Sequence, residues 1–367
     1  MTQLVVALLL LVPVHRPTLT AWPVASVRAQ AGAAARWHGA YAAAGAVYPR
    51  LLAVETVPEP SQRPAQRRPS GPAWLDMSLR ILIGIAMALL LALAGLLFFE
   101  NRFVFRPSRE PVESWQPPGP GVTECVFRAR DGVQLHAWWY PGSGADDVSD
   151  RPVLLWCHGN SGNITHRTEA FRRLVEHGLA VLLFDYRGYG KSEGRPSEHG
   201  LYMDGEAAYK YLVEAQGIEP GRIVCFGRSL GSVVALHVAL LRKTAGVVIE
   251  GAFVNLGAVV RHRHPVLPLA LFVRNRLDNL GRVRRLKVPL LVVHDSRDTL
   301  VPIAQARAVF NAAPGSKEFY AIEGSGHSDL SDFGNEQYYQ TLRRFCSSCV
   351  SKRGVPRAGS QAPREPS

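Results

Sequence analysis

The 367-residue sequence has little cysteine, and its cysteines do not form a disulfide framework. There are 5 Cys, an odd number that cannot pair completely, and Cys157 and Cys225 fall in or beside predicted core strands, where free thiols act as small hydrophobic groups. Cys346 and Cys349 have the spacing of a redox or zinc site, but no second pair accompanies them. We interpret these two as ordinary cysteines near a helix end, and we expect neither a metal nor a cofactor.

The sequence also has fewer acidic residues than basic ones, with 30 Asp and Glu against 42 Lys and Arg and a formal net charge of +12. The excess is concentrated at the ends. Residues 1–78 hold seven Arg against three acids, and residues 343–367 hold six basic residues against one acid. The middle of the chain has no basic stripe with interleaved aromatic residues, which argues against a nucleic-acid partner. The basic flanks are typical of segments that lie near anionic lipid or in solvent.

A phosphate-binding loop is absent as well. Gly190-Lys191-Ser192 resembles the end of such a loop, but the motif needs a glycine five residues before Gly190, and Asp185 occupies that position. We therefore interpret this stretch as a turn at a strand end, and the sequence excludes an ATPase of this class.

One long hydrophobic run is present, at residues 79–99, and it is apolar except for Arg80 near its beginning. Roughly 20 apolar residues are needed to cross a bilayer, so the run predicts a single transmembrane helix and a membrane location. Arginines flank both sides, and the orientation stays open. We predict that residues 1–78 are disordered or precede a true start at Met77, and that residues 346–367 form a disordered basic tail.

The most informative motif is Gly227-Arg228-Ser229-Leu230-Gly231. It lies between an apolar strand-like run at 223–226 and a helix-like stretch at 232–241, the setting in which a G-x-S-x-G turn exposes a serine hydroxyl. Glycines are required there because larger side chains would collide with the neighbouring strand and helix. Ser229 is our candidate nucleophile.

A nucleophilic serine needs a base and an acid that orients the base. We predict Asp298 as the acid, after the strand-like run 289–293, and His327 as the base, in a loop of small residues after the run 318–322. Asp295 and Glu250 remain alternative acids, because each also follows a predicted strand. We interpret the other two strand-end histidines as hydrogen-bonded loop residues; they are His158 and His294.

The same chemistry needs amide donors for a developing oxyanion. The N–H after the nucleophile belongs to Leu230. A glycine-rich turn, 157–163, follows the predicted strand 153–156, and its Asn160 is the best placed second donor. Asn163-Ile164-Thr165 in this turn is a glycosylation sequon, but a glycan would crowd the site, and we expect it to be unoccupied.

The order of elements predicts the fold. A hairpin around Asp131-Gly132 opens the domain, and strands then alternate with helices, which produces a mostly parallel, doubly wound α/β sheet. All three candidate side chains follow strand ends, where such sheets place their active sites. The segment 251–287 departs from the alternation of strands and helices, and we predict that it forms a short lid. Its apolar run 266–272, flanked by arginines, could line an acyl pocket, touch the bilayer or cap the core.

These motifs together resemble the membrane-anchored α/β-hydrolase domain-containing serine hydrolases. The resemblance rests on His158-Gly159-Asn160-Ser161-Gly162-Asn163, on Phe184-Asp185-Tyr186-Arg187-Gly188-Tyr189-Gly190-Lys191-Ser192 and on the serine motif, and it extends over about 103–345. It implies an α/β-hydrolase fold, a single-pass anchor and hydrolysis of esters or thioesters, including palmitoyl groups on proteins in some relatives.

We therefore predict a serine hydrolase of esters or thioesters, with acyl lipids or acylated proteins among the substrates it could take. Two alternatives stay open. The same three groups can cleave peptides, as in an aminopeptidase, and the fold could serve as a non-catalytic membrane scaffold. The presence of all three candidate groups argues against the scaffold, because a pseudoenzyme has no need of them.

Overall fold

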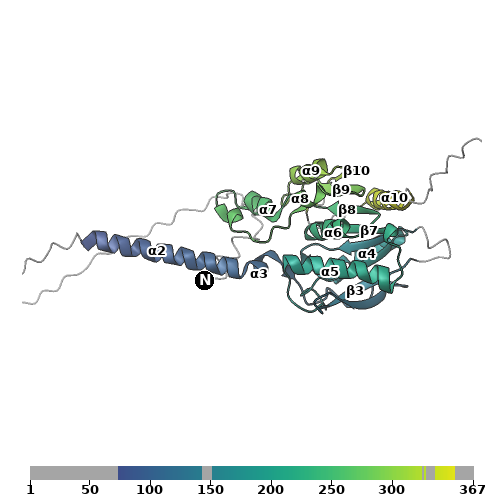
Figure 1. The fold of residues 1–367 in the computed structure, drawn as a ribbon, viewed down its shortest axis with the longest axis horizontal. Coiled ribbons are helices and arrows are strands. Elements are labelled where there is room, and N and C mark those ends of the chain that lie inside the picture. Colours follow the sequence, from purple (N-terminus) through teal and green to yellow (C-terminus); the bar gives the residue numbers. More distant parts are fainter. Residues whose placement is uncertain (1–72, 143–150, 325, 328–334, 352–367) are drawn as a thin grey trace, which may run out of the picture. The chain divides into compact units, whose positions relative to one another are not determined.

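A computed structural model describes residues 73–142, 151–324, 326–327 and 335–351. Within it, the residues from Leu90 onward belong to one compact unit built around an eight-stranded sheet in the order β10-β9-β8-β7-β4-β6-β3-β2 (Figure 1). The strands are β2 (Thr123–Arg128), β3 (Gln134–Tyr140), β4 (Val153–Cys157), β6 (Ala180–Phe184), β7 (Ile223–Arg228), β8 (Gly246–Glu250), β9 (Leu290–Asp295) and β10 (Lys317–Ile322).

The pairing within the sheet follows from the sequence pattern. Six neighbouring strands pair in parallel, in the order β10-β9-β8-β7-β4-β6. The central ones are apolar and fully buried, as parallel strands covered on both faces must be. β2 and β3 pair antiparallel around the Asp131-Gly132 turn, where Gly132 has a φ of 85° that favours glycine. The prediction of a mostly parallel α/β sheet opened by a hairpin is confirmed.

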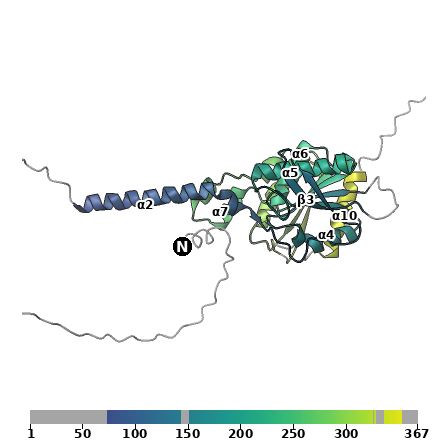
Figure 2. The same ribbon diagram turned by 90° about the horizontal axis from the view of Figure 1, so that it is seen from below.

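Helices cover both faces of the sheet (Figure 2). The core cluster on one face includes side chains of α5 (Glu198–Lys210), α6 (Leu230–Leu241), α8 (Asn279–Val283) and α9 (Ile303–Ala312). The cluster on the other face includes side chains of α4 (Thr168–Glu176) and α10 (Glu336–Ser351). Two cores separated by one sheet define the doubly wound arrangement.

Two helix boundaries differ from the sequence prediction. α10 runs to Ser351, past residue 346, where we placed the beginning of a disordered tail. The helix continues because Cys346 and Cys349 are buried against the sheet as small hydrophobic side chains. The sequence pattern predicts a helix over 201–214, and α5 begins earlier, at Glu198, because the Ser197 hydroxyl accepts the N–H of Gly200 at 3.1 Å.

The N-terminal part of the described chain is the helix α2 (Ala73–Phe98), and its stretch Met77–Gly95 is long and apolar enough to cross a membrane. The helix begins at Ala73, so the end of the segment 1–78 is helical and not disordered; residues 1–72 lie outside the described residues. A short helix α3 (Glu100–Val104) and a strand β1 (Arg106–Pro107) follow, and β1 pairs with β5 (Ser161–Gly162).

The predicted lid, 251–287, contains the helix α7 (Leu256–Arg263), the single turn η4 (Pro268–Leu271) and α8. α8 packs on the sheet with α6 and α9, as its buried Val283 shows. α7 also reaches this core through Leu256 and Val259, whereas η4 contains no buried residue.

Candidate active site

Ser229 occupies the sharp turn between β7 and α6, with a φ of 47°, a value that residues other than glycine rarely adopt. Such a conformation costs about 1–3 kcal/mol. It is held in part by the Ser229 N–H, which donates to the carbonyl oxygen of Glu250 on β8 at 2.7 Å. The strain directs the hydroxyl away from the sheet and past the end of the strand.

The two flanking glycines are required by close packing of backbone atoms. A methyl group on Gly227 would lie 2.3 Å from the carbonyl oxygen of Gly231, and one on Gly231 would lie 1.8 Å from the carbonyl oxygen of Cys157. Both distances are far below any van der Waals contact, and the groups in the way are backbone. Only hydrogen fits at these two positions, which lets α6 begin directly above the ends of β4 and β7.

The three side chains selected from the sequence lie in one hydrogen-bonded row. Ser229 Oγ lies 2.9 Å from His327 Nε2, and His327 Nδ1 lies 2.6 Å from Asp298 Oδ2. The other carboxylate oxygen, Asp298 Oδ1, accepts the N–H groups of Leu300 and Val301 at 2.9 and 2.8 Å. Asp298 is 1% exposed and His327 15%, so the carboxylate is sealed from water while the imidazole edge can reach a substrate.

The alternative acid Asp295 has a different place. Its Oδ2 accepts the N–H of Gly326 at 2.9 Å, and its Oδ1 accepts the N–H of Arg297 at 2.6 Å. Gly326 directly precedes His327. Asp295 thus ties the histidine loop to the end of β9 without touching the imidazole.

The other alternative, Glu250, is fully buried, and its carboxylate has partners other than the imidazole. Its Oε2 accepts the hydroxyl proton of Tyr338 at 2.9 Å, and its Oε1 lies 3.7 Å from Arg228 Nε. Burial raises the pKa of Glu250 above its ordinary value, although Arg228 and the Tyr338 hydroxyl oppose that rise. A carboxyl group that ionises reluctantly is poorly suited to stabilise an imidazolium.

Arg228, which sequence reasoning did not select, connects these groups. Its guanidinium donates to the carbonyl oxygen of His327 at 3.4 Å while its other side faces Glu250. The residue lies in the variable position of the serine motif, next to Ser229. Its position next to Ser229 was the only feature of the sequence that could have pointed to Arg228, because nothing in the sequence shows that residues 228 and 327 are in contact.

The remaining strand-end histidines have structural partners, as we expected. His294 Nε2 lies 2.8 Å from the carbonyl oxygen of Val301, and burial lowers the pKa of this imidazole. His158 is fully buried, with Nδ1 at 2.7 Å from the Gly159 carbonyl oxygen and Nε2 at 3.5 Å from Asp185.

Asp185 organises the floor beneath the glycine-rich turn. Its carboxylate lies 3.5 Å from both His136 Nδ1 and His158 Nε2, and its Oδ1 accepts the N–H of Ile164 at 3.0 Å. Burial acts to raise the pKa of Asp185, but the interactions with the two histidines outweigh it and hold that pKa below its ordinary value. A buried carboxylate therefore supports both ends of the turn 157–163.

The two amides selected as oxyanion donors belong to segments that meet at Ser229. Leu230 is the first residue of α6, so its N–H has no acceptor within the helix. The turn comes close on the other side, since a methyl group on Gly159 would lie 3.8 Å from Ser229 Cβ. Asn160 is the next residue along this turn.

The side chain of Asn160 has a function that we did not foresee from the sequence. Its Nδ2 donates to the carbonyl oxygen of Val104 at 2.6 Å, and its Oδ1 accepts the N–H of Arg106 at 3.2 Å and the hydroxyl of Tyr189 at 2.9 Å. The chain leaving α3 is therefore fastened to the turn that carries the candidate donor.

Two further features bear on the site. The sequon residue Asn163 is fully buried, and its Nδ2 donates to the carbonyl oxygen of Glu110 at 2.7 Å, which leaves no room for a glycan in the folded chain. Among the residues that the structure describes, no group of three or more His, Cys, Asp or Glu side chains is placed to bind a metal ion.

A doubly wound sheet with a serine on a strained strand-to-helix turn, and with a carboxylate and an imidazole that follow two later strands, β9 and β10, is the arrangement of the α/β-hydrolase fold. The chain belongs to the α/β-hydrolases. The family model described as serine aminopeptidase, S33, matches residues 149–281.

Relatives with similar sequences extend over most of the chain. An uncharacterized protein of Mycobacterium tuberculosis is 34% identical over 273 residues, which cover 72% of this chain and 95% of that protein. The alpha/beta hydrolase domain-containing protein WAV2 of Arabidopsis thaliana is 27% identical over 289 residues, 71% of this chain and 91% of that protein.

Solved structures support the same fold. An esterase of Pyrococcus furiosus superimposes with a TM-score of 0.54 at 22% identity, covering 67% of this chain and 98% of that one. An acetyl xylan esterase from Paenibacillus sp. R4 has a TM-score of 0.51 at 20% identity, covering 70% and 93%.

Proposed function

We propose that this α/β-hydrolase is a membrane-anchored serine hydrolase that cleaves carboxylic esters or thioesters through an acyl-enzyme. The observation that carries the proposal is the row of hydrogen bonds from Ser229 Oγ through His327 to Asp298, at 2.9 and 2.6 Å. The distance between Ser229 and His327 is short enough for direct proton transfer, and the distance between His327 and Asp298 is short enough for a hydrogen bond that orients the imidazole. The esterases among the structural neighbours are consistent with this activity.

In the first half of the reaction, His327 Nε2 takes the hydroxyl proton as Ser229 Oγ bonds to the substrate carbonyl carbon. The carbonyl oxygen becomes an oxyanion and is bound by the N–H groups of Leu230 and Asn160. Each such donor contributes roughly 3 kcal/mol of transition-state stabilisation. The imidazolium then gives its proton to the leaving alcohol or thiol, and the acyl group stays on Ser229.

In the second half, His327 removes a proton from a water molecule, which attacks the acyl carbonyl carbon. The collapse of this second tetrahedral intermediate releases the acid and returns the proton from the imidazolium to Ser229 Oγ. Asp298 stabilises the imidazolium in both halves and keeps Nδ1 protonated. The two backbone bonds to Asp298 Oδ1 hold the carboxylate in place throughout.

The membrane part of the proposal rests on α2, whose stretch Met77–Gly95 is apolar except for Ser78 and Arg80, and none of it is buried by the described part of the chain. A helix that is hydrophobic on nearly all sides and is not covered by protein suits a bilayer. Membrane lipid is thus the proposed partner of α2. The substrates we favour are acyl lipids or acylated proteins at the membrane surface.

Replacing the nucleophile tests the proposed function. Ser229→Ala should abolish hydrolysis of a p-nitrophenyl ester and of a thioester, and should abolish labelling by a fluorophosphonate probe. Ser348→Ala is the matched control, because that hydroxyl only donates to the Phe345 carbonyl oxygen on α10. Full activity in Ser229→Ala would refute the assignment, and an unlabelled wild-type protein would favour a non-catalytic scaffold.

A peptidase is the second candidate, and the family model described as a serine aminopeptidase favours it. The same relay can cleave an amide if the leaving amine is protonated well. Comparing kcat/KM for a thioester with that for an aminoacyl anilide separates the two activities. A higher value for the anilide would establish the peptidase.

A further inference from the structure

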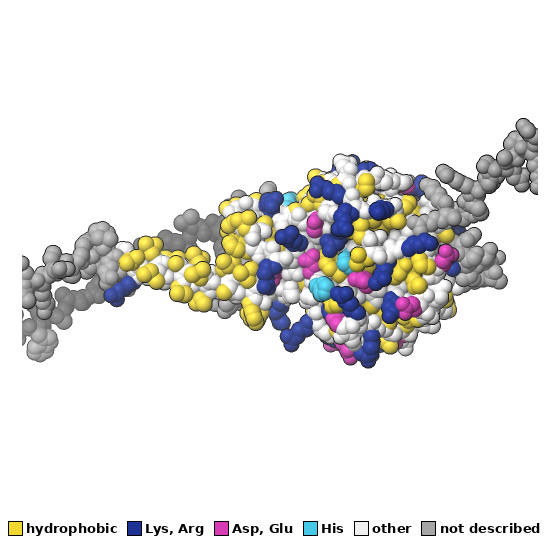
Figure 3. Space-filling model, viewed as in Figure 1, with side chains coloured by type: hydrophobic (Ala, Val, Ile, Leu, Met, Phe, Trp, Pro, Cys, Tyr) yellow, Lys and Arg dark blue, Asp and Glu magenta, His cyan; other side chains and the backbone are white. Residues whose placement is uncertain are grey.

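The chain around η4 exposes large apolar side chains. Val266 is 90% exposed and Leu271 81%, and Leu267 and Phe272 are exposed beside them. Figure 3 shows hydrophobic side chains gathered over this part of the molecule, where Figure 1 places α7. An exposed apolar cluster on one short segment is characteristic of a surface that binds a membrane, a ligand or another protein.

This segment is fastened to the end of the apolar helix. Buried Glu100 on α3 accepts the N–H groups of Arg274 and Asn275, each at 2.9 Å, and its Oε2 lies 2.9 Å from Arg274 Nε. The Arg274 guanidinium also donates to the carbonyl oxygen of Leu97. Burial acts to raise the pKa of Glu100, but the hydrogen bonds from Asn275 and Arg274 outweigh it, so the carboxylate stays ionised.

These contacts join the segment to the end of the candidate span. Leu97 follows Gly95, the last residue of the candidate span, by two residues of the same helix. At 1.5 Å per residue, Leu97, whose carbonyl oxygen accepts from Arg274, lies about 3 Å along the helix past the end of the span. The exposed run from Val266 to Phe272 ends two residues before Arg274.

The surroundings have the composition of a membrane interface. Phe98 and Phe99, which follow the span, are 80% and 51% exposed. The stretches 98–107 and 256–277 together contain six arginines and a single acidic residue, Glu100. Exposed apolar side chains flanked by basic groups are what an anionic lipid surface binds.

We propose that Val266, Leu267, Leu271 and Phe272, here called the lid surface, insert into the leaflet next to the span, with the exposed side chains of Arg102, Arg261 and Arg276 on anionic headgroups. This inference rests on the membrane anchoring proposed above. It adds a second, peripheral attachment that holds the catalytic unit in one orientation on the bilayer.

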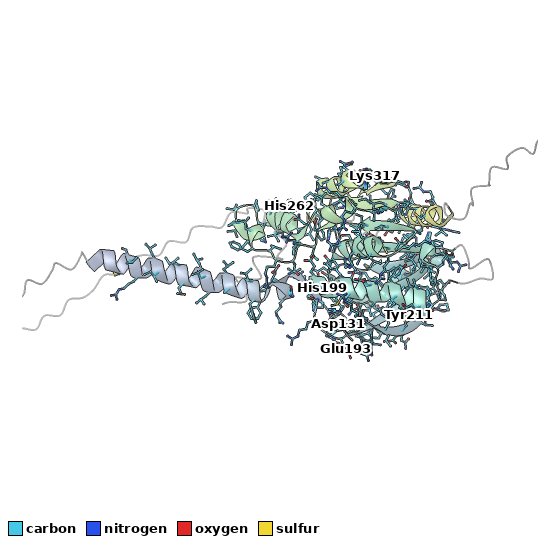
Figure 4. The ribbon with its side chains drawn as sticks, viewed as in Figure 1. Asp131, Glu193, His199, Tyr211, His262 and Lys317 are labelled. Atoms are coloured by element: carbon cyan, nitrogen blue, oxygen red, sulfur yellow. The ribbon has the colours of Figure 1, made fainter. Side chains whose placement is uncertain are left out.

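The lid surface is connected to the catalytic end of the sheet. Gly251, where the lid begins, lies against the imidazole, since a methyl group there would be 3.4 Å from His327 Cε1. On α7, His262 Nε2 lies 3.3 Å from the carbonyl oxygen of Thr299, the residue after Asp298 (Figure 4). A docked lid surface therefore keeps Ser229 close to the leaflet, where esters of membrane-resident acyl chains are the available substrates.

Depth-dependent quenching tests the insertion. The full-length chain is reconstituted in nanodiscs of phosphatidylcholine with phosphatidylserine, with an environment-sensitive fluorophore on Val266→Cys or Leu271→Cys. Leu241→Cys is the control, because this leucine is also exposed, at 58%, but lies at the end of α6 that is far from Ser229. The wild type gives the background from native cysteines. Doxyl groups on the lipid chains should quench residues 266 and 271 at least about twofold more than residue 241.

Equal quenching at the three positions would overturn the insertion. If residues 266 and 271 are quenched as strongly in discs without phosphatidylserine as in discs with it, the role of the arginines would be overturned. The fluorophosphonate probe applied to the same discs reports Ser229 separately, so an inactive enzyme with a docked lid refutes the proposed function and not this inference. A chain that does not stay with the discs refutes both the anchor and the docking.

Kinetics provide an independent readout. Val266→Ser combined with Leu271→Ser should raise KM for a long-chain ester embedded in the discs about tenfold, and should leave hydrolysis of soluble p-nitrophenyl acetate unchanged. Leu241→Ser should change neither. An equal loss on both substrates would show that the lid residues support the fold or the pocket, and would contradict docking.

Discussion

At the residue scale, Asp295 and Asp298 show how two carboxylates three positions apart receive different tasks. Both leave β9, and both accept backbone N–H groups. Only Asp298 reaches the imidazole, because its Oδ1 is turned inward by Leu300 and Val301 and its Oδ2 then faces His327. Asp295 accepts from Gly326 and holds the loop.

This division of tasks makes a prediction. Asp298→Asn should keep the fold, judged by circular dichroism, and lower kcat by about 10⁴, because the amide no longer holds Nδ1 protonated or stabilises the imidazolium. Asp295→Asn keeps one acceptor and should lower kcat by about tenfold at most. Steady-state hydrolysis of a soluble ester measures both. Equal losses would contradict the assignment of the acid.

A second residue-scale prediction concerns Asp185. Asp185→Asn should lower the free energy of unfolding at pH 7 by about 2 kcal/mol, because a buried charge-assisted network is lost. The folded-state pKa of Asp185 is below its ordinary value, so its stabilisation is present above the unfolded-state pKa of about 4 and is lost as pH falls through the folded-state value.

The measurement is urea unfolding of the wild type and of Asp185→Asn in detergent between pH 3 and pH 7. The difference between the two should be largest near neutral pH and should narrow below about pH 4. A difference that does not vary with pH would mean that the carboxylate's charge does not contribute.

At the scale of the elements, the strand-to-helix turn is the best specified part of the chain. Gly227→Ala should lower the free energy of unfolding by about 3 kcal/mol, since the methyl group would meet backbone atoms at 2.3 and 2.6 Å. Gly315→Ala is the matched control, because nothing lies within 4 Å of a methyl group there. Thermal unfolding compares the two. A stable, active Gly227→Ala protein would show that the turn can open.

The sequence predicts β4, β7 and β9 to within one or two residues, because these central strands are uninterrupted apolar runs that only a covered parallel sheet accommodates. It also selects the three side chains that the structure brings together at Ser229, since each follows a predicted strand.

The sequence could not predict contacts between short or distant segments. β1 and β5 have two residues each, so neither shows a periodicity. The bonds from Asn160 to Val104 and Arg106 join residues more than fifty positions apart. The same holds for Arg228 and His327, whose contact depends on how β10 is placed beside β9. Such contacts are determined by the tertiary fold and not by local pattern.

At the scale of the whole molecule, the proposed membrane anchor can be tested by placing charges in the apolar helix. Met87→Arg combined with Leu90→Arg places two charges near the middle of the apolar stretch, at a cost of about 3 kcal/mol each. The variant should move from the carbonate-resistant membrane fraction to the supernatant and keep its activity on a soluble ester. Retention in the membrane fraction would contradict the span. Unchanged fractionation of Arg80→Gln, at the helix end, is the control.

The order of the strands also bears on how the enzyme comes into being. His327 follows β10, the outermost strand, and its partner serine lies 98 positions earlier in the chain. A polypeptide still emerging from the ribosome can therefore fold its nucleophile long before it possesses a base. In the mechanism proposed above, hydrolysis begins only when the final strand joins the sheet, so the nascent chain would not act on esters around it until synthesis is nearly complete.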